Sequence, residues 1–165
     1  MRIRWVGYHS IIMDKDIGLK ISMYKAIKES RLRKIYVCNY LLKRAKVLLD
    51  IDKEVIIDIR NWYKRKELIK GEIIRNMEGK SIILTSMGIG SKVIISELRE
   101  EYPENIYIDI GSALDLICTK RDSRGKKSYE EQKEIFAPLL PENWEDPKNN
   151  YIFEEAKHKL GIHLN

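Results

Sequence analysis

The chain has 165 residues, of which 44% are hydrophobic and 34% charged, so it can bury one sizeable core. Its two cysteines, Cys38 and Cys118, have no CxxC spacing and no neighbouring histidines, which argues against a disulfide framework or structural zinc site and favours a reducing, cytoplasmic setting. No apolar run approaches the roughly 20 residues of a membrane span, and the amino terminus lacks the apolar region of a signal peptide.

The charge of the chain is uneven. Residues 1–80 hold 20 Lys and Arg against 10 Asp and Glu, whereas residues 81–165 hold 11 against 15. A basic amino-terminal half favours phosphorylated or polyanionic partners, and the alternative is that most of these cations cover solvated helix faces. Nucleic acid is therefore a partner class that we consider but do not favour.

In chain order, a basic arm without a clear pattern over residues 1–13 is followed by alternating helices and strands. Helices are predicted over residues 14–30, about 40–49, 62–77, about 128–136 and 149–160, and strands over 34–38, 54–59, 82–85 and 106–108. Each of the last two strands passes through a turn into a further helical pattern. Residues 137–165 form a proline-punctuated loop and a last helix. This order predicts a single α/β domain over residues 1–165, a Rossmann-like three-layer sandwich with a mostly parallel sheet of about four strands.

The two central strands each run into a turn that contains glycine, and ligands of parallel sheets bind at this carboxyl edge. After the first of them come Gly88, Gly90, Ser91 and Lys92. A turn without side chains lets backbone N–H groups approach a phosphate at the start of the following helix. The turn matches neither the Walker A nor the GxGxxG pattern, so the alternative is that the glycines only permit a tight strand-to-helix turn.

The second turn combines an acid with small polar residues: Asp109, Gly111, Ser112 and Asp115. A polar loop further on carries Ser123 and Arg124, and a guanidinium can bind phosphate through two hydrogen bonds. The alternative is that Asp109 and Ser112 cap a helix and that the arginines are solvated. For Trp62, which follows the second strand, packing is favoured over stacking on a base or sugar.

The segment YIDIGSALDLICTKRDSRG, preceded by ILTSMGIGSKVIISEL, resembles the GT-D type glycosyltransferases, a family of bacterial and viral sugar transferases. The resemblance covers about residues 33–130 and is carried by residues 81–125. It implies a Rossmann-like fold and transfer of a sugar from a nucleotide-diphosphate donor to an acceptor. On this reading Asp109 and Asp115 are the catalytic candidates. The donor-binding candidates are Gly88, Gly90, Ser91, Lys92, Gly111, Ser112, Ser123 and Arg124.

The chain also departs from the family pattern. It contains no RFGDGE-like acidic segment, and Gly125 follows the Ser-Arg pair where tyrosine is common. We therefore consider a shortened member, with a partner chain supplying the acidic segment, or a non-catalytic Rossmann-like protein that binds a nucleotide or nucleic acid. The cofactor is left open. A divalent cation such as manganese or magnesium is the candidate, with Asp109 and Asp115 as better ligands than the other acidic pairs.

Overall fold

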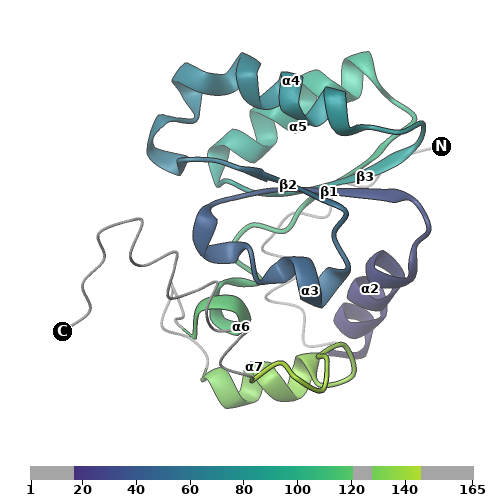
Figure 1. Cartoon of the computed structure of the whole chain (residues 1–165), viewed down its shortest axis with the longest axis vertical. Helices are drawn as coiled ribbons and strands as arrows, with labels where there is room; N and C mark the ends of the chain where they lie inside the picture. The colour runs from purple at the N-terminus through teal and green to yellow at the C-terminus, as the bar shows by residue number, and fades with distance from the viewer. Residues whose placement is uncertain (1–16, 121–127, 146–165) are drawn as a thin grey trace.

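A four-stranded parallel sheet forms the centre of the molecule (Figure 1). The computed structural model describes residues 17–120 and 128–145. In their order across the sheet, its strands are β2 (Lys53–Ile56), β1 (Arg33–Cys38), β3 (Ser81–Ser86) and β4 (Ile106–Asp109). Each neighbouring pair is parallel, which confirms the predicted α/β class and the Rossmann-like arrangement of a mostly parallel sheet.

Helices cover both faces of this sheet, so the described chain has three layers (Figure 1). One face carries α4 (Lys66–Asn76) and α5 (Ile89–Glu101). The other face carries α2 (Ile17–Glu29), α3 (Ala45–Leu49), α6 (Asp115–Thr119) and α7 (Tyr129–Phe136). Three short 3-10 helices complete the connections: η1 (Tyr40–Leu42), η2 (Ile59–Asn61) and η3 (Tyr63–Arg65).

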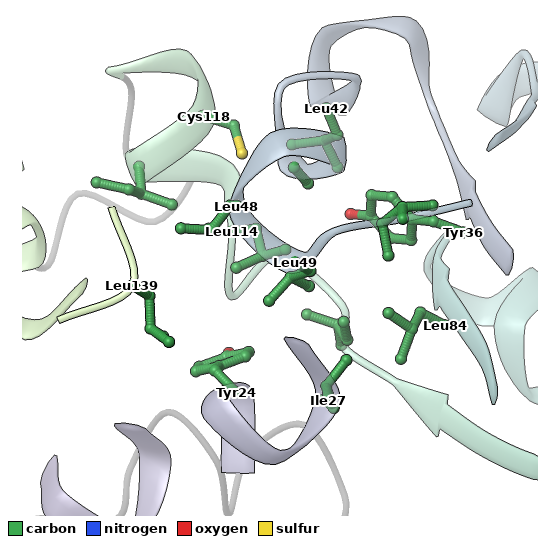
Figure 2. Packing of buried hydrophobic residues seen from close by; sticks show 14 of the residues in the cluster. Tyr24, Ile27, Tyr36, Leu42, Leu48, Leu49, Leu84, Leu114, Cys118 and Leu139 are labelled. Atoms are coloured by element: carbon green, nitrogen blue, oxygen red, sulfur yellow. The ribbon is translucent and has the colours of Figure 1, made fainter. Parts of the chain in front are cut away.

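Each face of the sheet has its own apolar core, because successive side chains of a strand point to opposite faces. On β3, Ile83 packs with α4 and α5, whereas the next residue, Leu84, packs with α2, α3 and α6. Figure 2 shows this second core, in which Tyr24 and Leu48 come from two of the covering helices. All six residues of β3 are buried, as expected for a central strand with helices on both sides.

The helix predicted over residues 40–49 is divided into η1 and the shorter α3. Asn39 caps the first piece, since its side chain accepts a hydrogen bond of 2.8 Å from the Leu41 N–H. The second piece ends at Asp50, whose φ of 53° is left-handed. The predicted bounds of this connection are therefore correct, but the break within it was not predicted.

The strand and helix around Asp58 also differ from the prediction. β2 ends at Ile56 instead of residue 59, and α4 begins at Lys66 instead of residue 62. The Asp58 carboxylate accepts hydrogen bonds from the Arg60 N–H at 3.0 Å and from the Asn61 side chain at 2.9 Å. These bonds fold the chain into η2 directly after the strand. Side-chain to backbone bonds of this kind compete with regular helix and sheet.

The predicted helix over residues 128–136 is confirmed as α7, which begins with a capping box between Ser128 and Glu131. Within the described ranges, no helix has the length and apolar character needed to cross a membrane. Two predicted elements lie outside these ranges, namely the arm over residues 1–13 and the helix over 149–160.

Candidate functional site

The strand order places a crossover point between β1 and β3. From β1 the chain moves to β2 on one side, then passes over β1 to β3 on the other side. The connection after β1 lies on the α3 face and the connection after β3 lies on the α5 face. In open α/β sheets, ligands bind at the carboxyl ends of strands where the winding direction reverses in this way. The turn that carries Gly88 follows β3 at this edge.

The two predicted turns lie side by side at this carboxyl edge. Thr85, near the end of β3, is in register with Asp109, the last residue of β4. Beyond the strands, the Thr85 carbonyl accepts hydrogen bonds from the N–H groups of Ile110 at 2.9 Å and Gly111 at 3.3 Å. The start of the second turn is therefore bonded directly to the strand that leads into the first one.

The two glycines of the first turn have different roles. Gly88 is exposed and has φ of 60° and ψ of −133°, a conformation that side chains strongly disfavour. Gly90 is buried, and a Cβ at its position would lie 2.6 Å from Met87 Cε and 2.8 Å from Trp62 Cδ2. Gly88 is thus required by the shape of the turn, and Gly90 by the close approach of Trp62, which has a packing role as predicted.

A cluster of polar side chains lies beneath the start of α5. Burial raises the pKa of the Asp109 carboxyl, while a hydrogen bond with Ser91, the Gly111 N–H and the charge of Lys92 act in the opposite direction. The Asp109 carboxylate accepts the Gly111 N–H at 3.1 Å. Ser91 is buried, and its hydroxyl also accepts the Met87 N–H at 3.2 Å. The arrangement gives a half-buried carboxylate of raised basicity next to a cation and a helix N-terminus.

Thr85 extends this cluster, and sequence reasoning had not selected it. Its hydroxyl is buried and has no hydrogen-bond partner among the described residues, although its neighbour across the strands is Asp109. Thr85 shares a sheet face with Ile83, which packs against α5. A buried hydroxyl without a partner is unusual in a folded protein. The signal in the sequence was a polar residue at the end of an otherwise apolar strand.

The second turn differs in part from the prediction. Gly111 has a positive φ of 58°, as a tight turn requires. The expectation that the Ser112 side chain caps the next helix is wrong, because α6 begins at Asp115 with Leu114 as the capping residue and no side-chain bond. Ser112 contributes its carbonyl instead, which accepts the Asp115 N–H at 3.1 Å.

The two acids predicted as catalytic belong to different faces of the sheet. Asp109 interacts with Ser91 at the start of α5. Asp115 is the first residue of α6, which packs into the opposite core. The pKa of Tyr36 in that core is raised above all by burial, with the charge of Asp115 as a smaller contribution. The structure therefore places Asp109 beside the first turn and Asp115 on the opposite face of the sheet.

Metal binding and the arginine loop remain predictions. In residues 17–120 and 128–145, no three or more His, Cys, Asp or Glu side chains form a group that could hold a metal ion. Ser123 and Arg124 lie outside the described residues.

At the crossover point itself, a buried hydrogen bond joins β1 to β3. The Tyr36 hydroxyl donates to the Ser86 hydroxyl at 2.8 Å. The sequence offered one clue, because a tyrosine within an apolar strand needs a polar partner for its hydroxyl. The bond links the two central strands on the face of the sheet opposite to Asp109 and Ser91.

Comparison of the chain with protein-family models, with curated proteins and with solved structures gives no match.

Proposed function

We propose that the chain is a glycosyltransferase-like domain that binds a nucleotide-diphosphate sugar at the carboxyl edge of its sheet. The observation that carries the proposal is the placement of the half-buried Asp109 against Ser91 and Lys92, at the start of the 13-residue helix α5. A helix N-terminus and a lysine attract a diphosphate, and a carboxylate of raised pKa suits proton transfer or hydroxyl binding. The motifs that resemble GT-D type glycosyltransferases fall on these same two turns.

Each group has a defined role in this proposal. The exposed Gly88 turn presents the N–H groups that open α5 to the diphosphate, since the first N–H groups of a helix have no acceptor in a preceding turn. The Ser91 N–H is the exception, because it donates to the Gly88 carbonyl at 3.1 Å. Lys92, which is exposed one turn into the helix, neutralises part of the phosphate charge. Asp109 accepts the proton of the attacking hydroxyl while the bond between the anomeric carbon and the diphosphate oxygen breaks. Water in place of the acceptor gives donor hydrolysis.

A second candidate is a non-catalytic Rossmann-like protein that binds a nucleotide at the same turns. The placement of Asp115 on the opposite face favours it, because one carboxylate remains where two were expected. Binding would still use the Gly88 turn and Lys92, but no proton transfer would follow.

Calorimetric titration of the full chain with uridine and guanosine diphosphate sugars, with and without manganese, tests both candidates. The proposal predicts binding, and slow donor hydrolysis that Asp109→Asn abolishes and the matched variant Asp115→Asn preserves. Binding without hydrolysis would support the second candidate. If no nucleotide sugar binds, the proposed donor binding is wrong. If Asp115→Asn alone removes hydrolysis, the assignment of Asp109 is wrong.

A further inference from the structure

The elements around the β2 edge of the sheet carry exposed apolar side chains. Val47 on α3, Ile56 on β2 and Leu68 on α4 are respectively 38%, 37% and 63% exposed. Lys46, next to Val47, contacts Glu54 of β2 at 3.8 Å, so α3 and β2 meet at this edge. Large apolar side chains gathered on adjacent elements indicate an interaction surface more strongly than single exposed ones do.

A groove runs along this edge between β2 and α4. It has a volume of about 160 Å³, and its apolar lining includes Ile56, Trp62 and Leu68. Its charged lining consists of Arg65, Arg75, Asp58 and Glu72, and Glu72 pairs with Arg75 at 2.5 Å. Among the described strands, β2 has a neighbour on one side only, which is β1. The backbone of an edge strand can pair with an additional strand, whose alternate side chains would then enter the groove.

The charges around the groove indicate the chemistry of such a strand. Lys53, Lys64 and Arg65 are exposed and form no ion pair with any residue in the described ranges. Asp58, the acid beside them, already accepts two hydrogen bonds within its own turn, and these bonds lower its pKa. Cations without partners at a groove rim favour an occupant that carries carboxylates.

A second copy of this chain fits the surface less well. In an antiparallel pair of β2 strands, the start of each strand lies beside the end of its mate. Lys53 at the start would then face the cations Arg60, Lys64 and Arg65 that follow the end. The acids beside Lys53 already have partners, because Asp52 accepts the Lys34 N–H at 2.7 Å and Glu54 pairs with Lys46 at 3.8 Å. Repulsion between like charges disfavours this arrangement.

We propose that the β2 edge and its groove bind an extended segment of a partner protein, in which apolar residues alternate with Asp or Glu. The segment adds a fifth strand beside β2. Its apolar side chains cover Val47 and Ile56, since Ile56 points to the α3 face when its neighbour Val55 packs against α4. Its carboxylates lie on the α4 face, where they pair with Lys53 and Arg65. This interaction is independent of nucleotide binding at the Gly88 turn, so either proposal can fail alone.

Selection from a displayed random-peptide library on the immobilised full chain tests the proposal. We expect enrichment of peptides with alternating apolar and acidic residues. Ile56→Lys and Arg65→Glu should each weaken binding of an enriched peptide roughly tenfold or more. The matched control is Ile106→Lys, because Ile106 is 38% exposed on β4 at the opposite edge of the sheet and should leave binding unchanged.

Four results would overturn the proposal. The first is selection without enrichment, or enrichment of basic peptides. The second is equal binding by Ile56→Lys and wild type when circular dichroism shows that both are folded. The third is a dimer in sedimentation that Ile56→Lys dissociates, since the occupant would then be a second copy. The fourth is binding of an oligonucleotide, lost with Arg65→Glu, in a chain that selects no peptides.

Discussion

Replacing Gly90 with alanine tests whether the turn before α5 is shaped by packing. The added methyl group would lie 2.6 Å from Met87 Cε, 2.8 Å from Trp62 Cδ2 and 3.1 Å from Trp62 Cε2. The Met87 methyl ends a flexible side chain, but Met87 is buried and the Trp62 ring is rigid. Overpacking of this kind costs about 1–3 kcal/mol, whereas alanine gains at most about 1 kcal/mol over glycine within a helix. We expect a net loss of about 1–2 kcal/mol.

Urea unfolding followed by circular dichroism measures this loss, which corresponds to a melting temperature lower by about 2–8 °C at roughly 2–4 °C per kcal/mol. Gly71→Ala is the matched control, because Gly71 lies within α4 and a Cβ there meets only the Arg75 guanidinium at 3.5 Å. That variant should gain about 0.5–1 kcal/mol from helix propensity.

The reasoning fails if Gly90→Ala is as stable as the wild type or more stable. It also fails if the loss persists unchanged when Trp62 is replaced by leucine. In that double variant the conflict with the Trp62 ring is relieved and the one with the flexible Met87 methyl remains, so the two substitutions should show a favourable coupling. A coupling near zero would mean that Trp62 does not press on the turn.

Two further predictions concern buried and charged groups. Tyr36→Phe leaves the buried Ser86 hydroxyl without its 2.8 Å donor and should lower the free energy of unfolding in urea by about 1–3 kcal/mol. Adding Ser86→Ala should lower it little further, and additive losses would contradict the pairing. Hydrogen bonds from Tyr129 and two lysines lower the pKa of Glu145 to about 2, so this group stabilises the fold above the usual glutamate range and the stability is lost as pH falls towards 2. Unfolding of Glu145→Gln should therefore depend less on pH between about 5 and 2 than that of the wild type or of Glu142→Gln, and equal slopes would exclude this role.

The sheet and the position of its two turns could be predicted because they depend on local patterns. The run of apolar residues in β3 and the glycines after it mark a buried parallel strand and the turn that must follow. Once the strands are parallel, their carboxyl ends share one edge, so the proximity of Asp109 to the first turn follows from topology. The register of Thr85 with Asp109 bears this out.

Other features depend on contacts between distant parts of the chain, and local patterns carry no information about them. Arg44 is buried and donates a hydrogen bond to the Trp144 carbonyl, and its guanidinium carbon Cζ lies 3.9 Å from the centre of the Trp144 ring. A hundred residues separate the two. The face on which Asp115 lies was also beyond prediction, since it depends on how the turn after Asp109 directs α6 across the end of the sheet.

Trp62 connects the two regions for which we propose a function. One part of its ring contacts Gly90 in the turn before α5, and the side chain also lines the groove beside β2. A substitution of Trp62 would therefore disturb both regions and could not tell one function from the other. Ile56 and Arg65 lie at the groove, Asp109 and Gly88 lie at the turns, and none of the four is required by both. Variants at these positions can therefore separate binding at the edge from binding at the turns.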